Sequence, residues 1–382
     1  MRKYSQKPQK SFSVVKILII VTIVAALFFA LIKYFDLGKY FFKGPQTVVQ
    51  LITDSGLKSD NDRINVLLLG IGGVGHDGPD LTDTIILASV KKDGSDVALI
   101  SIPRDLWVPD VSYKINHIYA IGQEDDENGL ELAEENVSVL MGLPIHYAAR
   151  VDFNGFIKAV NLVEGLDINV ENSFVDPRYP IPGKEDDLCG LTIEEQEKDG
   201  VKEQVVKDAT GAAIPLIDIT DDGSPFVCRY ETLSFKKGPT QMDGVTALKF
   251  VRSRHGTNGE GSDFARSARQ QKVILAFREK VFSTGTLTNP KTIIDLIGTF
   301  DQSIDTNIKN EDVPLFVKLS QKIDPNKIRA IVLDAGREES VLEFGLPQNY
   351  GGQSVIIPKD ANWTELSEYV QGEVFKLEEQ EN

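Results

Sequence analysis

From residue 64 onward, short apolar runs alternate with longer segments of helical spacing. INVLLLG (64–70), TIILASV (84–90) and DVALISIP (96–103) have the length and the β-branched content of buried strands. K-K-D-G-S, between the second and third runs, predicts a hairpin turn. Further strands are predicted at 147–151, 166–170, 329–333 and 354–357, and helices at 130–141, 154–165, 241–251, 263–282, 291–299, 313–321 and from Trp363. This alternation predicts an α/β fold, a central mixed sheet with helices on both faces.

The apolar run nearest the N-terminus has a different character. ILIIVTIVAALFFALI (17–32) contains no charge, and with its flanks (14–35) it is long enough to span a bilayer. Residues 1–16 carry five basic and no acidic side chains, which favours a cytoplasmic N-terminus. A cleaved signal peptide is the alternative, but no A-x-A site follows the run. We therefore predict a cytoplasmic tail (1–13) and one transmembrane helix (14–35) in the cell membrane, with the rest of the chain extracytoplasmic.

The exported part divides by composition. Residues 36–60 are predicted to be a membrane-proximal linker, 61–285 a catalytic domain, and 286–382 a C-terminal part that completes it. Residues 176–229 are acidic and contain Gly and Pro, so they are predicted to be an insertion into the domain. Twelve acidic and four basic residues between positions 184 and 222 supply half of the net charge of −16. A chain this acidic lacks the basic surplus that nucleic-acid binding requires.

The two cysteines, Cys189 and Cys228, flank the acidic stretch. In an oxidising compartment this arrangement predicts a disulfide that closes the insertion as a loop. Two unrelated thiols are the alternative. The chain has no C-x-x-C and four histidines, so a zinc site is not expected.

Gly70 to Gly75 fit the G-x-G-x-x-G pattern and follow a predicted strand. A dinucleotide site also needs a helix that begins at once, so that its N-terminus meets the diphosphate. Here HDGPDLTD follows, with Gly and Pro in place of the helix, and then another strand. We therefore predict no nucleotide cofactor and interpret the segment as a flexible glycine loop near a site.

Charged residues stand where the predicted strands begin and end. Asp83 opens the second strand, Arg104 follows the third, and Lys114 comes soon after. Charged side chains at strand ends tend to face the crevice in which α/β proteins bind ligands. Ordinary surface turns are the alternative interpretation, because Asp starts turns readily.

The strongest candidate is a group of cations in an otherwise acidic chain. It consists of Arg252 and Arg254 in VRSRH, and of Arg266, Arg269 and Gln270 in DFARSARQQ. The first two project to the same side if their segment is extended, and the other three share one helical face. Arginine is well suited to bidentate contact with phosphate oxygens. A salt-bridged surface helix is the alternative, but only Glu260 and Asp263 are nearby to pair, so anion binding is predicted.

In this order the motifs resemble the LytR–CpsA–Psr family of cell-wall glycopolymer ligases. The matching blocks are NVLLLG, LTDTIILASV, SIPRDLWV, KINHIYA, GLPIHYAARVDFNGFIKAVNLVEGLDINV, MDGVTALKFVRSRH and DFARSARQQ, within residues 64 to 280. The resemblance implies an α/β phosphotransferase behind one N-terminal anchor. It would move a phosphoglycan from a polyprenyl-diphosphate carrier to peptidoglycan.

The resemblance also implies roles for individual residues. The expected diphosphate contacts are Arg104, Arg252, Arg254 and Arg266, with Gln270 assisting. Asp83 is expected to help bind Mg²⁺ (or Mn²⁺), and Asp83, Arg104 and Arg252 are the expected catalytic residues.

One departure from the family concerns the metal. The family usually has a second metal-binding Asp soon after the LLLG strand, where this chain has Gly72. Asp77 or Asp80 of the glycine loop is the expected replacement. Two other functions remain open on the sequence: a hydrolase that uses water at the same site, and a non-catalytic binder of prenyl diphosphates or anionic polymers.

Overall fold

The computed structural model describes residues 56–76, 78–125, 127–198, 201–214, 225–282, 303–324 and 327–376. The predicted tail (1–13), anchor (14–35), most of the linker (36–60) and the helix predicted at 291–299 lie outside these ranges. Within them, no helix is both long and apolar enough to cross a membrane. By its contacts the chain divides into two units, residues 1–57 with 310–317 and residues 58–309 with 318–382. Every element of the sheet and of the site belongs to the second unit.

A six-stranded mixed sheet with the order β14-β6-β1-β2-β3-β15 forms the centre of this unit. Its strands are β1 (Arg63–Ile71), β2 (Thr82–Lys91), β3 (Val97–Ser101), β6 (Tyr147–Asp152), β14 (Ile304–Thr306) and β15 (Ile328–Val332). β1, β2 and β3 are antiparallel neighbours, and β14 is antiparallel to β6. The pairs β1–β6 and β3–β15 are parallel. The predicted α/β class and mixed sheet are confirmed.

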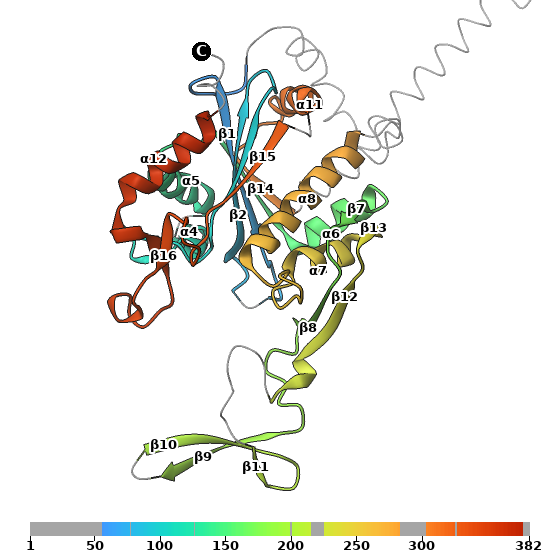
Figure 1. Cartoon of the computed structure of the whole chain (residues 1–382), viewed down its shortest axis with the longest axis vertical. Coiled ribbons are helices and arrows are strands. Elements are labelled where there is room, and N and C mark those ends of the chain that lie inside the picture. Colours follow the sequence, from blue (N-terminus) through green and yellow to red (C-terminus); the bar gives the residue numbers. More distant parts are fainter. Residues whose placement is uncertain are drawn as a thin grey trace, which may run out of the picture. The chain divides into compact units, whose positions relative to one another are not determined.

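Helices lie on both sides of the sheet (Figure 1). One group is α4 (Ile115–Asp125), α5 (Gly129–Met141) and α12 (Trp363–Phe375), and the other is α6 (Phe153–Leu162), α7 (Gly244–Arg252) and α8 (Asp263–Phe282). Side chains alternate between the two faces of a strand, so Leu67, Leu69 and Ile71 of β1 enter the core beneath the first group. A second core, which includes Val160 and Phe250, lies among the second group.

The insertion leaves the domain through a two-stranded ribbon of β8 (Phe174–Pro180) and β12 (Tyr230–Phe235). Beyond it, β9 (Thr192–Lys198), β10 (Val201–Lys207) and β11 (Ala213–Ile214) form a separate three-stranded sheet. Cys189 and Cys228 form a disulfide with their Cα atoms 5.5 Å apart. The loop that carries the three-stranded sheet is therefore closed covalently.

Short pairs complete the described structure. They are β4 (Trp107–Val108) with β5 (Tyr113–Lys114), β7 (Leu166–Val170) with β13 (Gly238–Met242), and β16 (Leu342–Phe344) with β17 (Ile356–Pro358). The remaining α-helix is α11 (Val313–Lys322). The predicted helix 263–282 has the same bounds as α8, whereas 241–251 was predicted too early, because Gln241 and Met242 belong to β13. Helix α4 was not predicted.

Candidate active site

The register of the sheet places Asp83 and Arg104 at one end of the central strands. β2 runs antiparallel to β1 and β3, so its first residues lie beside the last residues of both neighbours. Asp83 is near the start of β2, and Arg104 follows β3 by a short turn. The first turns of α8 reach the same end of the strands, where Gln270 Nε2 donates a hydrogen bond to Thr84 Oγ1 at 3.0 Å.

A pocket at this end of the strands, the arginine pocket, is lined by four of the predicted site residues. Asp83, Arg104, Arg266 and Gln270 all line it. Arg104 Nη1 donates to Asp83 Oδ1 at 2.6 Å, and Arg266 Nη2 lies 2.6 Å from Asp263 Oδ1. Each guanidinium is held by a carboxylate at one end, which leaves further N–H groups to meet an anion.

The pKa shifts show that charges of both signs crowd this pocket. Burial disfavours the charged form of Arg104, but the carboxylates of Asp83 and Asp105 outweigh burial and raise its pKa. Burial lowers the pKa of Arg266, and repulsion from Arg254 and Arg104 lowers it further. Arg104 and Arg254 are therefore both close enough to Arg266 to repel its charge, and an anion beside Arg266 would relieve that repulsion.

Lys114 joins the pocket through Asp105. Its Nζ donates to Asp105 Oδ1 at 2.7 Å, and Arg104 Nε lies 3.6 Å from the other oxygen of the same carboxylate. Asp105 thus fixes the spacing between two cations.

The backbone at Arg254 is held in place by a buried carboxylate that sequence reasoning missed. Asp176 of β8 is fully buried, and its Oδ2 accepts from Ser253 Oγ at 2.6 Å and from the backbone N–H groups of Arg254 and His255 at 3.2 Å. Burial tends to raise the pKa of Asp176, but these hydrogen bonds lower it overall. The only sequence signal was an Asp within a short alternating strand.

Arg252 is not among the residues that line the arginine pocket, and its contacts are with two aromatic rings. It is the last residue of α7, so the backbone is helical at Arg252, and the extended segment that would project Arg252 and Arg254 to the same side is not present at this residue. Its guanidinium carbon lies 4.2 Å from the centroid of the Phe153 ring, and Nη1 donates to Tyr179 Oη at 3.3 Å. His76 of the glycine loop meets the same Phe153 ring edge-on at 5.2 Å.

Arg269 departs from the expectation that it shares a binding face with Arg266. Its side chain is 4% exposed, and it donates to the carbonyl oxygens of Phe250, Ser253 and Glu260 and to Glu260 Oε2, all within 2.8 Å. Such a guanidinium has little capacity left for a ligand. Its position braces the turn that carries Arg252 and Arg254.

Of the described carboxylates expected to bind the metal, only Asp83 lines the arginine pocket. Asp83 lies in the arginine pocket and Asp80 is half-buried in the glycine loop, whereas Asp77 lies outside the described residues. Gly73 has φ +78°, and a Cβ there would lie 2.9 Å from Asp152 Cβ, so the loop passes close above β6. Within the described ranges, the one cluster of three potential metal ligands is at the disulfide, not in the pocket.

The sequence matches the LytR_cpsA_psr family over residues 43–349, most of the chain. The chain belongs to this family. A polyisoprenyl-teichoic acid–peptidoglycan teichoic acid transferase TagU from Oceanobacillus iheyensis is 26% identical over 63% of this chain and 59% of its own length. A protein of the same name from Enterococcus faecalis is 24% identical over 76% of this chain and 78% of its own. The chain thus spans about three fifths of the first relative and over three quarters of the second.

Solved structures agree on the fold. The crystal structure of Bacillus subtilis TagV superposes with a TM-score of 0.52 at 19% identity, covering 83% of this chain and 98% of that one. At this identity the likeness establishes the fold alone.

Proposed function

We propose that this chain is an extracytoplasmic phosphotransferase, which moves a phosphoglycan from a polyprenyl-diphosphate carrier to peptidoglycan. Membership of the LytR_cpsA_psr family and the printed names of the relatives support this class of reaction. The closed disulfide supports a location outside the cytoplasm, where disulfides persist. In the proposed arrangement residues 14–35 anchor the chain in the cell membrane as a single pass.

The observation that carries the proposal is the pocket in which Arg104 and Arg266 lie beside Asp83, with Arg254 close enough to repel Arg266. The arginines come from three separate segments, and burial with mutual repulsion lowers the pKa of Arg266. Partly buried like charges are costly unless an anion neutralises them. A diphosphate supplies several anionic oxygens in the spacing that guanidinium groups bind well.

The proposed chemistry breaks the bond between the phosphorus that carries the glycan and the bridging oxygen, so that polyprenyl phosphate leaves. A hydroxyl oxygen of the acceptor forms the new bond to phosphorus and gives its proton to a carboxylate of the pocket. Charge grows on the bridging oxygen during this step. In this proposal Arg104 and Arg266, whose guanidinium groups are held by Asp83 and Asp263, stabilise it together with Arg254, whose backbone N–H donates to Asp176.

The residues of the pocket fit Mg²⁺ (or Mn²⁺) in one particular way. Asp83 is 41% exposed, and among the described residues no cluster of three potential metal ligands lies in this pocket. Mg²⁺ commonly binds to one or two carboxylates together with substrate phosphates. We therefore propose that Asp83 holds the metal jointly with the diphosphate, with Asp80 or Asp77 as a second carboxylate. When bound, the ion supplies positive charge to the phosphoryl oxygens.

Metal and substrate should bind cooperatively for a structural reason. Asp83 pairs with Arg104 at 2.6 Å, so an ion that takes the carboxylate releases the guanidinium for the diphosphate. The converse holds as well, because a diphosphate that engages Arg104 frees Asp83. Whichever ligand binds first breaks the Asp83–Arg104 ion pair, so the second ligand binds without the cost of breaking it.

The test uses the full chain in mild detergent with a polyprenyl-diphosphate glycan and peptidoglycan fragments, with and without Mg²⁺. We expect metal-dependent release of polyprenyl phosphate with glycan on the acceptor, and loss of both in Arg252→Ala and Asp83→Ala. Release without labelled acceptor would favour the hydrolase. Tight donor binding without turnover, indifferent to Asp83→Ala, would favour the non-catalytic binder.

A further inference from the structure

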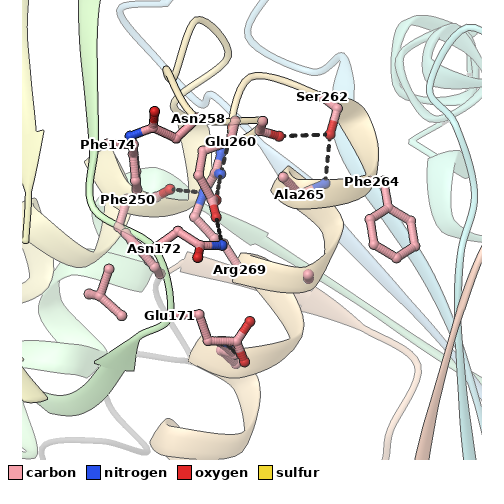
Figure 2. A pocket seen from close by; sticks show the side chains of 14 residues that line it. Glu171, Asn172, Phe174, Phe250, Asn258, Glu260, Ser262, Phe264, Ala265 and Arg269 are labelled. Carbon is pink, nitrogen blue, oxygen red and sulfur yellow. Dashed lines mark hydrogen bonds and ion pairs between the residues drawn. The ribbon is translucent and has the colours of Figure 1, made fainter. Parts of the chain in front are cut away.

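A second pocket, the α8 cleft, lies across helix α8 from the arginine pocket. Figure 2 shows it between the segment after β7, the loop that precedes α8, and α8 itself. Phe264, Ala268 and Lys272 line the cleft, whereas Arg266 and Gln270 line the arginine pocket. An α-helix with its side chains is about 10–12 Å across, so the two pockets are separated by about one helix diameter.

The charges in the α8 cleft are balanced, in contrast to those of the arginine pocket. Lys272 Nζ lies 2.5 Å from Glu171 Oε1, and Arg269 Nη1 lies 2.8 Å from Glu260 Oε2. Both cations of the cleft thus have an anionic partner within the cleft. No surplus of either sign remains to attract a phosphate or an amine, which favours an uncharged ligand.

The remaining groups of the cleft combine amides with aromatic rings. Asn172 Nδ2 donates to Glu260 Oε1 at 3.1 Å, which leaves its amide oxygen to accept from a ligand (Figure 2). Asn258 also lines the cleft, and Phe264 at its rim is 50% exposed. Ligand sites combine apolar surface with a few fixed polar groups, and these amides match hydroxyl and acetamido groups.

We propose that the α8 cleft binds the N-acetylated aminosugar chain of the acceptor. Such a chain offers hydroxyl and acetamido groups to Asn172 and apolar ring faces to the exposed part of Phe264, whose ring also has the Arg337 guanidinium carbon 5.4 Å from its centroid. It also suits the neutral balance of the cleft. This inference rests on the proposed transfer reaction, because only a transferase needs a second site for an acceptor.

A structural link joins the α8 cleft to the arginine pocket. Arg269 in the cleft donates to the carbonyl oxygen of Ser253, the residue between Arg252 and Arg254. The wall of the cleft and the turn that carries the phosphate-binding arginines are therefore one hydrogen-bonded unit. A glycan in the cleft needs to pass only the N-terminal end of α8 to present a hydroxyl to the arginine pocket.

The first test measures binding alone, with chitohexaose as the probe and the full chain in detergent, by titration calorimetry. We expect saturable binding that weakens at least about tenfold in Asn172→Ala and in Phe264→Ala, because each removes one of the contacts proposed for the sugar chain. Phe344→Ala is the matched control, since Phe344 is 63% exposed and is not part of the cleft. No binding to the wild-type chain, or equal binding in all three variants, would overturn the proposal. Thermal unfolding of each variant separates lost contacts from lost folding.

The second test separates this inference from the proposed function. With peptidoglycan fragments as acceptor, the cleft variants should raise the acceptor KM while the donor KM stays at its wild-type value. If the wild-type chain binds chitohexaose through the cleft but cleaves no donor, the transferase proposal fails and the carbohydrate site stands. If it transfers glycan with an unchanged acceptor KM in both cleft variants, the transferase stands and the cleft proposal fails.

Discussion

Arg266 and Arg269 are three residues apart on the same helix, yet the structure uses them in opposite ways. Arg266 has one carboxylate partner and lines a pocket with Arg104, and Arg254 is close enough to repel its charge. Arg269 donates to four oxygens of three residues and is almost completely buried. The difference is one of hydrogen-bonding capacity, which in Arg266 remains for the proposed ligand and in Arg269 is already filled.

Removing Arg266 should have the largest effect on activity. We expect Arg266→Ala to lower kcat/KM for the polyprenyl-diphosphate donor about 10²–10³-fold, as loss of a preorganised charge partner does. Stability should change by no more than about 1 kcal/mol, because the ion pair with the 58% exposed Asp263 contributes little. Steady-state kinetics with thermal unfolding measures both, and a large loss of stability would contradict this role.

Removing Arg269 should lower stability strongly and activity less. Arg269→Ala leaves Glu260 and the carbonyl oxygens of Phe250 and Ser253 without their donor, so we expect a loss of about 3–5 kcal/mol in the free energy of unfolding. Denaturant titration measures it. Activity in the fraction that remains folded should fall less than in Arg266→Ala. If Arg269→Ala were fully stable but inactive, Arg269 would belong with the binding residues.

The pH dependence of stability tests the structural role of Asp176, which supports the turn that carries Arg254. Its folded-state pKa lies below the usual 3.8, because hydrogen bonds outweigh burial, and the unfolded state keeps the ordinary value. The stabilisation is therefore complete above about pH 4 and is lost as pH falls through the lowered pKa. We expect Asp176→Asn to cost about 2–3 kcal/mol at pH 7. The difference from wild type should shrink in acid, whereas a difference independent of pH would contradict the role of the charge.

Gln270 should give the smallest effect. It donates one hydrogen bond to Thr84 at the floor of the arginine pocket, worth about 1 kcal/mol. We therefore expect Gln270→Ala to lower kcat/KM about fivefold. Thr84→Val removes the partner and serves as the control. A loss as large as that of Arg266→Ala would mean that Gln270 contacts the reacting phosphate directly.

Much of the fold was predictable because its strands are nearly continuous apolar runs and its long helices have regular spacing. Strand β1 and helix α8 illustrate this, since burial of a whole strand or one helix face leaves a clear pattern. Helix α4 was missed because it begins immediately after β5, without a capping residue or a charge signal. The paired strands of the insertion were missed because their polar sequence carries no period of two.

The sequence indicated which residues share the candidate site, but not which of their side chains are occupied by internal hydrogen bonds. Motif order identified Asp83, Arg104 and Arg266, which do share a pocket. Helical spacing grouped Arg269 with Arg266, but spacing alone does not reveal that Glu260 and three carbonyl oxygens surround Arg269. Asp176 was missed because its partners lie more than seventy residues away, and contacts at such separation leave no local signal.

The central claim is that the three arginines bind a diphosphate jointly with a metal at Asp83. The most direct measurement titrates Mg²⁺ into the full chain with and without farnesyl diphosphate, by calorimetry, for wild type and for Asp83→Asn. We expect weak Mg²⁺ binding alone and affinity at least tenfold higher in the presence of the diphosphate, with this gain lost in Asp83→Asn. Equal Mg²⁺ affinity with and without the diphosphate, or a gain that persists in Asp83→Asn, would contradict the claim.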